Sequence, residues 1–291
     1  MKVLVTGAYG QLGSELKEKS VDYPGWKFLF TDIDTLDITG ERGIKEYFQK
    51  KQPEFVINCA AYTAVDQAED DHIIAERVNS KAPGLLAKEA NRADAGFVHI
   101  STDYVYGGEA FVPYTEMDNA APVTIYGRTK LKGERLCLEA NPDSVIIRTS
   151  WLYSSYGNNF VKTILQSGKI NRQVKVVYDQ AGTPTWASDL ADILFLIIEK
   201  FAENRQNVSS GIYNYSNEGV TSWFDFAKAV YEISDINSEV IPVLSSEFPT
   251  RAVRPHYSVL DKSKIKAAFG LKIPYWRDSL KKCLTKIQNI R

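Results

Sequence analysis

Lys2-Val-Leu-Val-Thr-Gly-Ala-Tyr-Gly-Gln-Leu-Gly13 is the stretch that decides the fold of this chain. The β-branched run at residues 3–6 predicts a strand, and the pattern at 11–19 predicts a helix. Between them, three glycines follow the spacing GxxGxxG. Glycines here permit a tight turn and let the backbone approach a pyrophosphate, whose charge the amides at a helix N-terminus stabilise. We therefore predict a dinucleotide site, with a plain strand–helix turn as the alternative.

Short β-branched runs alternate with helical patterns through the first half of the chain. Further strands are predicted at 28–31, 55–58, 96–101 and 144–148, and helices at 43–51, 66–79, 82–93 and 124–140. This alternation predicts parallel βαβ units with helices on both faces of the sheet. The predicted fold class is α/β, a Rossmann-type doubly wound parallel sheet.

The alternation ends beyond Trp151. Residues 153–159 are polar and turn-rich, and residues 245–257 hold Pro249, Pro255 and charged residues without periodicity. We predict a dinucleotide-binding Rossmann domain formed by residues 1–151 with about 183–221. A smaller C-terminal α/β substrate-binding domain is predicted from about 152–182 and 222–291.

Composition argues against several classes of partner. The 291 residues include 35 Lys and Arg against 36 Asp and Glu, a balance that disfavours nucleic-acid binding. Three cysteines, Cys59, Cys137 and Cys283, lack metal-ligand spacing and indicate a reducing compartment. The chain opens directly into a strand with no signal peptide ahead of it, and the apolar run at 193–198 is too short to span a bilayer. We expect a cytoplasmic protein without membrane or nucleic-acid partners.

Cofactor contacts are predicted at the ends of the first three strands. Asp32 stands about 20 residues after the glycines, where an acidic group bonds a ribose 2′-hydroxyl. Its charge opposes a 2′-phosphate and leans the site towards NADH over NADPH, and a simple turn aspartate is the alternative. Asp37 and Ile38 lie in the next loop, where an adenine could rest. The small residues after Asn58 suit close approach of a cofactor, and suit helix–sheet packing equally well. The predicted contacts are Gly7, Gly10, Gln11, Leu12, Gly13, Asp32, Asp37, Ile38, Ala60, Ala61 and Tyr62.

Tyr126 and Lys130 are spaced i, i+4, so they lie one turn apart on one face of the helix predicted at 124–140. A lysine beside a phenol favours the phenolate, so we predict a lowered pKa for Tyr126. Thr102 falls at the carboxyl end of a strand, the edge where open α/β sheets bind ligands. Its hydroxyl completes a site that can deliver a proton to a carbonyl oxygen. With hydride from a bound cofactor, the reaction is ketone reduction. Singly, each residue could be a cap or turn residue.

The chain resembles the extended short-chain dehydrogenase/reductase superfamily and, more narrowly, the family of dTDP-4-dehydrorhamnose reductases. The stretches that carry the resemblance run nearly end to end, at 7–13, 58–66, 101–106, 126–130, 148–151, 157–160, 182–185 and 254–256. The glycine and Tyr-x-x-x-Lys motifs mark the superfamily only. The stretches Arg148-Thr-Ser-Trp, Asn158-Asn-Phe and Arg254-Pro-His point to the reductases.

The resemblance implies a reaction and a set of roles. Tyr126 would protonate the C4 keto oxygen of dTDP-4-dehydro-L-rhamnose, with hydride delivered to C4 by NADPH or NADH to give dTDP-L-rhamnose. Lys130 would hold the nicotinamide ribose and tune Tyr126, so both residues join the cofactor contacts. Thr102 would bond the same oxygen, and Arg254 suits a pyrophosphate. The implied substrate contacts are Thr102, Asp103, Trp151, Asn158, Asn159 and Arg254. For the last three, loop hydrogen bonding or a surface salt bridge is the alternative.

The resemblance also raises a dimer bridged by a divalent metal on glutamates. Glu15 is available, but Ser188 stands where a second glutamate is expected. His72 and His99 show no partner pattern for metal binding or catalysis. We therefore predict no required metal, and either a monomer or a homodimer.

Two other functions remain open. One is another nucleotide-sugar enzyme on the same scaffold, such as a 4-epimerase, a dehydratase or a related 4-ketoreductase. A dehydratase is disfavoured because Asp103 is followed by Tyr104 rather than by glutamate. The other is a non-catalytic, dinucleotide-binding regulatory subunit, and the intact set of Thr102, Tyr126 and Lys130 argues against it.

Overall fold

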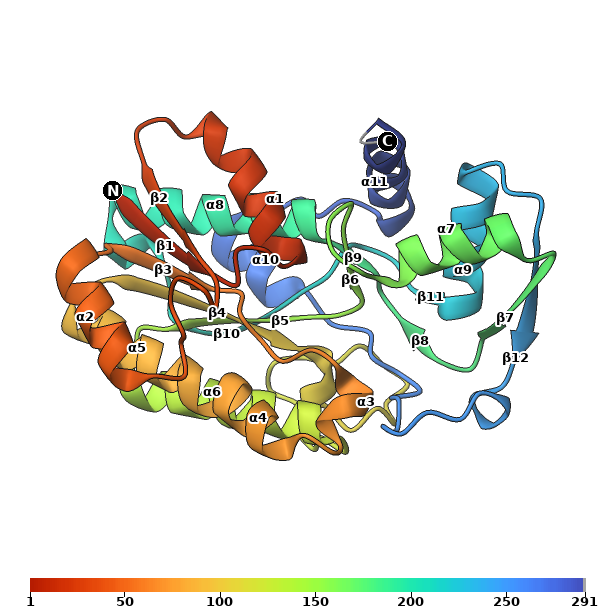
Figure 1. Cartoon of the computed structure of the whole chain (residues 1–291), viewed down its shortest axis with the longest axis horizontal. Helices are drawn as coiled ribbons and strands as arrows, with labels where there is room; N and C mark the ends of the chain where they lie inside the picture. Colours follow the sequence, from red (N-terminus) through yellow and green to blue (C-terminus); the bar gives the residue numbers. More distant parts are fainter. Residues whose placement is uncertain (290–291) are drawn as a thin grey trace.

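A computed structural model describes residues 1–289 and places a six-stranded parallel sheet at the centre of the molecule (Figure 1). The strand order is β10-β5-β4-β3-β1-β2, and each neighbouring pair is parallel. The strands are β1 (Lys2–Thr6), β2 (Lys27–Thr31), β3 (Phe55–Asn58), β4 (Gly96–Thr102), β5 (Val145–Thr149) and β10 (Gly211–Tyr215). The predicted α/β class and doubly wound sheet are confirmed.

The strand order reverses between β1 and β3. The chain runs from β1 outward to β2 and then crosses back to β3 on the other side of β1. Open α/β sheets bind their ligands outside the carboxyl ends of the strands at such a reversal. Residues that follow Thr6, Asn58 and Thr102 therefore meet at the edge where a ligand is expected.

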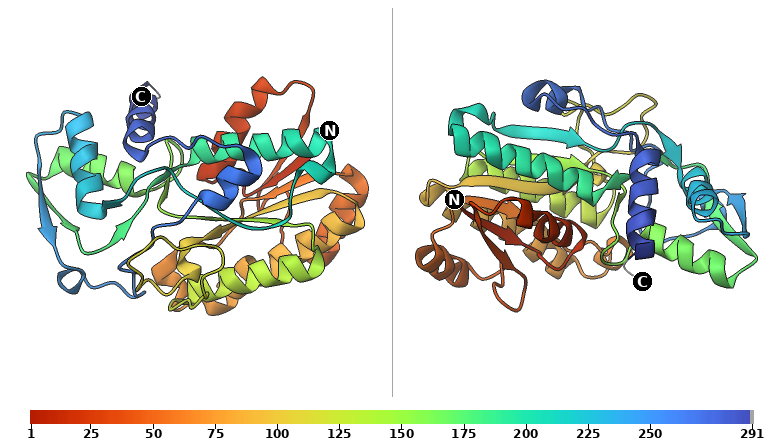
Figure 2. Two further views of the ribbon diagram at one scale, coloured as in Figure 1. Left: turned by 180° about the vertical axis from the view of Figure 1, so that it is seen from behind. Right: turned by 90° about the horizontal axis from the view of Figure 1, so that it is seen from above.

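Helices cover both faces of the sheet (Figures 1 and 2). On one face, Val3 and Val5 share an apolar core with Leu190. On the other, Leu4 shares a core with Ile44. Successive side chains of a strand point to opposite faces, so a sheet covered on both sides buries a continuous apolar run. The first face carries α1 (Gln11–Lys19), α8 (Ala187–Glu203) and α10 (Ser263–Phe269), and the second carries α2 (Glu41–Lys51), α5 (Ala82–Arg92) and α6 (Ile125–Ala140).

The helix predicted at 66–79 is broken in the structure. Two short helices, α3 (Val65–Ala68) and α4 (His72–Glu76), are followed by a π-helical turn, Arg77–Lys81, that continues into α5. This turn directs Asn79 and Ser80 inward, where both are buried and bond to other segments. Those tertiary hydrogen bonds favour the widened turn over a regular helix.

A second group of elements lies at the end of the sheet away from the N-terminus (Figures 1 and 2). Three two-stranded ladders pair β6 with β9, β7 with β12 and β8 with β11. Val161, Phe226 and Leu280 lie in an apolar core of their own. The elements are β6 (Leu152–Tyr153), α7 (Phe160–Ile170), β7 (Gln173–Val177), β8 (Ala181–Gly182), β9 (Thr185–Trp186), β11 (Thr221–Ser222), α9 (Trp223–Ile233), β12 (Glu239–Val243) and α11 (Trp276–Asn289).

The division into two domains stays a prediction. The second core gathers most of its residues from the segments assigned to the smaller domain, together with Trp186. Within the same assignment, Ile265 and Phe269 of α10 pack in the core of the sheet instead. Residues 290–291, at the end of the predicted second domain, lie outside the described residues.

Candidate active site

The three glycines form the turn from β1 into α1. Gly7 has a φ of +67°, and a Cβ there would lie 2.7 Å from the backbone nitrogen of Ala60. A Cβ on Gly13 would lie 2.4 Å from the carbonyl oxygen of Gly7. Both positions therefore require glycine. Gly10 precedes α1, and among the described residues no side chain caps this helix and no acidic residue stands in its first turn. Its first amides are open to an anion such as a pyrophosphate.

Asp32 lies beside the glycine turn. Its carboxylate accepts hydrogen bonds from the N–H of Tyr9 at 3.0 Å and the N–H of Ile33 at 2.9 Å. The bond from Tyr9 joins the end of β2 to the glycine turn. The structure thus brings Asp32 to the place where a ribose contact is expected, although the same bonds also serve the turn itself.

The other predicted cofactor contacts near the glycine turn differ in burial and in hydrogen bonding. In the first turn of α1, Leu12 is buried, and Gln11 Oε1 has no hydrogen-bond partner within residues 1–289. Asp37 accepts hydrogen bonds from the hydroxyl and amide of Thr39, which lower the pKa of its carboxyl group. Ile38 is buried in the core between the sheet and α2.

Ala60, Ala61 and Tyr62 follow β3, and Asn79 holds Tyr62 in place. The Asn79 side chain accepts from the Tyr62 N–H at 2.8 Å and donates to the Tyr62 carbonyl at 3.0 Å. It also donates to Thr129 Oγ1 at 3.3 Å. Asn79 therefore connects the cofactor edge to α6. The sequence does not predict this role of Asn79, because the orientation of its side chain depends on the π-helical turn.

Tyr126, Thr102 and Asp103 meet at the carboxyl end of β4. The Thr102 hydroxyl donates to Asp103 Oδ1 at 3.1 Å. Burial raises the pKa of the Tyr126 phenol, and the neighbouring Thr102 hydroxyl only partly opposes that effect. The ring of Tyr104 packs edge-on against Tyr126 with centroids 5.5 Å apart. Tyr126 is therefore held as a protonated phenol.

The predicted lowering of the Tyr126 pKa by Lys130 is wrong. The two residues do lie one turn apart on α6. However, Lys130 Nζ donates to the Ile100 carbonyl at 2.6 Å and lies 3.2 Å from His99 Nε2, so it is engaged with β4. Burial decides the protonation state of the Tyr126 phenol. The spacing of Tyr126 and Lys130 in the sequence gives no information about burial. Burial also lowers the pKa of Lys130 to about 8.

A buried ion pair anchors α6 to the sheet. Arg148 of β5 donates to both carboxylate oxygens of Glu134, at 2.9 and 2.7 Å, and Ser101 of β4 donates to the same carboxylate at 2.5 Å. At the start of α6, Thr124 Oγ1 accepts from the Gly127 N–H at 3.0 Å. The cap and the ion pair together position Tyr126 and Lys130 over the ends of the strands.

Trp151 forms an aromatic platform at the end of β5. It has a φ of +46°, a conformation rare for a side chain of this size. Its indole stacks on Trp223 with ring centroids 3.6 Å apart. A Cβ on Gly182 would lie 2.5 Å from the Trp151 ring and 2.7 Å from Ser258 Oγ. Ser258 Oγ and Asp103 Oδ2 are both buried and lie beside each other, and neither bonds any other group within residues 1–289. Polar groups with unused hydrogen-bonding capacity beside an aromatic face suit a sugar ligand.

Asp103 can act as a donor or an acceptor near neutral pH. Burial raises the pKa of its carboxyl group to about 7, while the Ser258 and Thr102 hydroxyls favour the carboxylate. Ser258 was not predicted from the sequence. A lone serine in an irregular stretch carries no signal, and only the fold brings it to Asp103.

Asn158 and Asn159 precede α7. Asn158 is exposed. Asn159 caps the helix, because its Oδ1 accepts from the Lys162 N–H at 3.1 Å, and its amide donates to the Ser154 carbonyl at 2.8 Å. Both amide groups stay predicted substrate contacts, and the side chain of Asn159 is already engaged within the protein.

Arg254 connects the C-terminal half of the chain to the first half. It donates to the Tyr104 hydroxyl at 3.1 Å and forms an ion pair with Asp66 of α3. Asp66 also accepts from the Ala252 N–H at 3.0 Å. These bonds use two of the five guanidinium donors and leave others for a ligand. Its pyrophosphate role stays a prediction.

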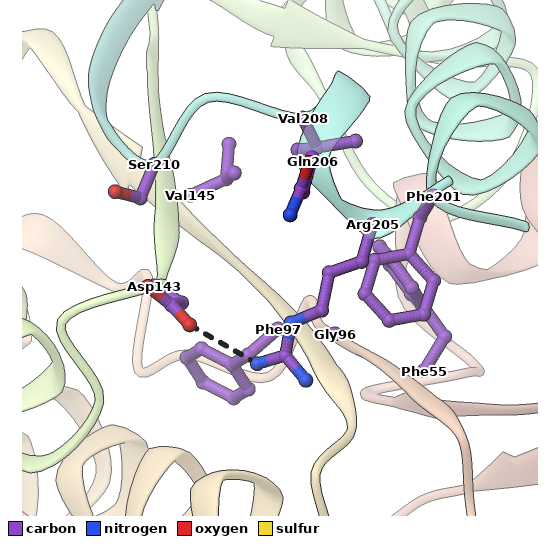
Figure 3. Close-up of a pocket in the computed structure, with 10 residues that line it drawn as sticks. All are labelled: Phe55, Gly96, Phe97, Asp143, Val145, Phe201, Arg205, Gln206, Val208 and Ser210. Atoms are coloured by element: carbon purple, nitrogen blue, oxygen red, sulfur yellow. Dashed lines mark hydrogen bonds and ion pairs between the residues drawn. The ribbon is translucent and has the colours of Figure 1, made fainter. Parts of the chain in front are cut away.

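A pocket lies at the opposite edge of the sheet (Figure 3). Its lining includes Phe55, Gly96 and Val145, the first residues of β3, β4 and β5. Arg205 donates to Asp143 Oδ2 at 3.1 Å within it. Because the residues described above gather at the carboxyl ends of the strands, this pocket is separate from the candidate active site.

Residues 1–289 contain no group of three or more His, Cys, Asp or Glu side chains placed to hold a metal ion. Glu15 instead accepts from Ser154 Oγ at 2.6 Å and pairs with Lys286 at 2.7 Å. Ser188 is buried. That no metal is required stays a prediction. Across the same residues, each helix is too short or too polar to cross a membrane.

The family model described as "RmlD substrate binding domain" matches residues 1–289. The chain belongs to the RmlD family. A dTDP-4-dehydrorhamnose reductase from Aggregatibacter actinomycetemcomitans is 40% identical over 286 residues, covering 96% of this chain and 97% of the relative. A crystal structure of a dTDP-4-dehydrorhamnose reductase from Clostridium acetobutylicum is 40% identical with a TM-score of 0.94, covering 99% of this chain and 100% of the other. The dTDP-4-dehydrorhamnose reductase of Bacillus anthracis, solved in complex with NADP, is 37% identical with a TM-score of 0.92, covering 98% and 99%.

Membership of the RmlD family confirms the resemblance drawn from the motifs. The matched region contains both the glycine turn and the Arg254 neighbourhood, so the whole candidate active site falls within the RmlD family match. The role of each residue in that site stays a prediction.

Proposed function

We propose that this chain is an NAD(P)H-dependent oxidoreductase that reduces the C4 ketone of dTDP-4-dehydro-L-rhamnose to dTDP-L-rhamnose. The observation that carries the proposal is the buried group at the end of β4. There a protonated Tyr126 phenol lies beside the Thr102 hydroxyl, with Lys130 one helical turn away. The substrate class is supported by relatives of the RmlD family, which are named for this reaction.

The residues present fit a dinucleotide. The glycine turn leaves the first amides of α1 open, and Gln11 Oε1 is buried without a partner within residues 1–289. The pyrophosphate would lie at the start of α1, with Asp32 near a ribose and Ala60 to Tyr62 along the edge of β3. When bound, the reduced nicotinamide supplies the hydride.

The chain's own residues supply the proton and the orientation. Tyr126 donates its phenolic proton to the keto oxygen as hydride reaches C4, and Thr102 donates a hydrogen bond to the same oxygen. Asp103 and Ser258 bond the sugar hydroxyls through Oδ2 and Oγ. The stacked Trp151 and Trp223 present an apolar face to the sugar and exclude water from it.

The test is an assay of cofactor oxidation with Tyr126→Phe. Native protein supplied with dTDP-4-dehydro-L-rhamnose and NADPH or NADH should oxidise the cofactor. Removal of the phenolic hydroxyl should lower kcat by roughly 100- to 10,000-fold, because the general acid is lost. The dissociation constant of NADPH, followed by fluorescence, should change little.

A matched control is Tyr23→Phe, a distant tyrosine whose ring stacks on Phe195. It should keep native turnover. Equal kcat values for native protein and Tyr126→Phe would contradict the role of Tyr126. Turnover of a GDP- or UDP-linked 4-keto sugar but not of the dTDP-linked one would contradict the substrate.

The same purified protein can be used to distinguish the proposed reductase from the two other functions. Purified protein that carries stoichiometric NAD and interconverts sugar epimers without net oxidation would indicate an epimerase. Dinucleotide binding without oxidation of NADPH or NADH by any 4-keto sugar nucleotide would indicate a regulatory subunit. We further propose that the protein acts in the cytoplasm as a monomer or homodimer without nucleic-acid partners, which fractionation and light scattering test.

A further inference from the structure

Four buried side chains form a continuous chain of contacts behind the candidate active site. Thr6 of β1 donates from Oγ1 to Asn58 Oδ1 of β3 at 2.8 Å. Asn58 Nδ2 lies 3.0 Å from His99 Nδ1 of β4, and His99 Nε2 lies 3.2 Å from Lys130 Nζ of α6. Each of the four residues is at most 1% exposed. The reduction proposed above gives His99 no role.

The orientation of the Asn58 amide follows from a backbone donor. Its Oδ1 accepts from the Ala60 N–H at 3.2 Å as well as from Thr6 Oγ1. A reversed amide would turn its NH₂ group towards the Ala60 N–H, leaving two donors face to face. Asn58 Nδ2 is therefore the group that faces His99.

The tautomer of His99 follows from that orientation. Since Asn58 Nδ2 is a donor, His99 Nδ1 must accept. Burial holds the pKa of His99 well below its ordinary range, so the ring is neutral and carries one proton. That proton is on Nε2, directed at Lys130 Nζ.

We propose that His99 is a positioning residue that favours the neutral amine of Lys130 over its ammonium in the cofactor-free protein. A neutral amine accepts from His99 Nε2–H through its lone pair and donates to the Ile100 carbonyl, at the observed 3.2 and 2.6 Å. An ammonium has no lone pair and would place an N–H against the His99 N–H.

The charges around Lys130 do not change this conclusion. On its own helix, Glu134 is paired with Arg148, which bonds both carboxylate oxygens. The thiols of Cys59, after β3, and Cys137, on α6, face Lys130, and burial raises the pKa of both, so they remain uncharged. Within residues 1–289, no carboxylate forms an ion pair with Lys130. Burial lowers the pKa of Lys130 to about 8, so a larger share of the amine is uncharged near neutral pH than in an ordinary lysine.

The consequence concerns the catalytic phenol. A charged Lys130 would favour the phenolate of Tyr126, whereas a neutral amine leaves the phenol protonated. A larger share of neutral amine therefore favours the protonated phenol, the form of Tyr126 that ketone reduction requires. In the proposed function Lys130 would hold the ribose of a bound cofactor, and as an ammonium it would first take up a proton from solvent. This role rests on the proposed function, but the protonation states can be measured without cofactor or turnover.

The first experiment reads the tautomer of His99 directly. The chain has three histidines, so ¹⁵N-histidine labelling of the cofactor-free protein gives few signals, which His72→Gln and His256→Gln assign by loss. Long-range ¹H–¹⁵N correlation should show the Nε2–H tautomer for His99 at pH 7 to 9. A proton on Nδ1 in the native protein would overturn the proposal.

The second experiment follows the protonation of Lys130. In ¹³Cε-lysine protein, the signal lost in Lys130→Met should titrate with a midpoint near the value of about 8 given by burial. Asn58→Asp supplies an acceptor that keeps the contacts to Thr6 and Ala60. It should switch His99 to the Nδ1–H tautomer and raise the Lys130 midpoint by at least about one pH unit, a tenfold gain in proton affinity.

A double variant separates the tautomer from the added charge. Asn58→Asp combined with His99→Phe keeps the new carboxylate but removes the imidazole ring. We compare how far Asn58→Asp raises the Lys130 midpoint in the native protein and in the His99→Phe variant. The rise should be smaller in the His99→Phe variant. Equal rises would show that charge alone acts and would overturn the role of His99. Because every readout uses cofactor-free protein, these results stand even if the ketone assay fails.

Discussion

In the candidate site, folding clearly changes the ionisation of the Asp103 carboxyl group. The residue is 3% exposed, and within residues 1–289 its carboxyl group meets only the Ser258 and Thr102 side chains and nearby backbone. Burial raises its pKa to about 7, against about 3.9 for an unfolded aspartate. The native state therefore keeps a proton that the unfolded state releases.

The sign of the pH dependence follows from that difference. The contribution of Asp103 to stability is fully present below about pH 3.9 and is lost as pH rises through about 7. Asp103→Asn removes this loss, so the variant should gain stability relative to the native protein as pH rises, by on the order of 4 kcal/mol between pH 4 and pH 8. Urea unfolding at the two pH values measures the difference.

Asp34→Asn is the matched control, because Asp34 is exposed in the loop after β2. Its unfolding free energy should run parallel to that of the native protein at both pH values. A constant difference between Asp103→Asn and the native protein across this range would show that the carboxyl group ionises normally in the fold.

Single residues show where reasoning from sequence stops. The spacing of Tyr126 and Lys130 predicts that they share a helix face, and they do. The same spacing predicts the wrong direction for the Tyr126 pKa, because burial depends on neighbours from distant segments. Ser258 and Asn79 carry no motif of their own, and only tertiary structure brings them to the site.

At the scale of elements, α6 is the helix that carries the proposed chemistry, and its anchor is the Glu134–Arg148 pair. Both side chains are almost fully buried. Removal of one partner leaves the other charge unpaired in the interior, so Glu134→Ala should lower the unfolding free energy by about 3–5 kcal/mol. Chemical denaturation at pH 7 measures this loss.

Glu139→Ala is the control on the same helix, because Glu139 is exposed and its removal should change stability by no more than about 0.5 kcal/mol. A loss of under about 1 kcal/mol for Glu134→Ala would mean that Arg148 finds water or another acceptor, and that the pair does not anchor α6.

Close packing of α6 against the π-helical turn restricts the size of the residue at position 133. A Cβ on Gly133 would lie 2.1 Å from the Asn79 carbonyl oxygen, which belongs to backbone and cannot rotate away. Gly133→Ala should therefore push α6 from the turn, destabilise the protein by roughly 1–3 kcal/mol and weaken NADPH binding. Thermal unfolding and cofactor titration test both effects.

A glycine-to-alanine substitution in α2 should instead raise the stability of the protein. In the described part of the chain nothing lies within 4 Å of a Cβ at Gly43, so Gly43→Ala should stabilise α2 by roughly 0.5–1 kcal/mol. If both variants change stability in the same direction, steric contact with Asn79 is not what Gly133 avoids.

Element prediction succeeded where local pattern and tertiary packing agree. The strands of the first half are continuous apolar runs because the sheet is covered on both faces. The helix predicted at 66–79 failed because inward hydrogen bonds from Asn79 and Ser80 compensate for the irregular turn. Strands of two residues, such as β8 and β9, lack a periodicity that any pattern could reveal.

At the scale of the whole molecule, the candidate site is formed where distant parts of the chain meet. Tyr126 and Thr102 come from the sheet region, whereas Trp223 and Ser258 come from the C-terminal half. The glycine turn and strand order made the position of a cofactor predictable. The predicted substrate contacts in the second half rest on family resemblance alone, because that half lacks a regular alternation of elements.

Arg254 lies at this junction and gives the last prediction. Its guanidinium group bonds Tyr104 and Asp66, which belong to the first half of the chain. These bonds leave other guanidinium donors for a ligand. If those donors hold the pyrophosphate of the nucleotide sugar, Arg254→Met should raise KM for that substrate roughly 10- to 100-fold, the effect of losing a charge-assisted contact. The dissociation constant of NADPH should stay near native, because the glycine turn is intact.

Arg251→Met provides the comparison, since Arg251 lies three residues earlier and forms an exposed ion pair with Asp70. Loss of an exposed pair costs little, so both KM and stability should stay near native. Steady-state kinetics against each substrate, with thermal unfolding of both variants, separates a binding role from a structural one. A fall in thermal stability of Arg254→Met with an unchanged KM would assign Arg254 to the junction with Asp66 alone, and would leave the pyrophosphate to other donors.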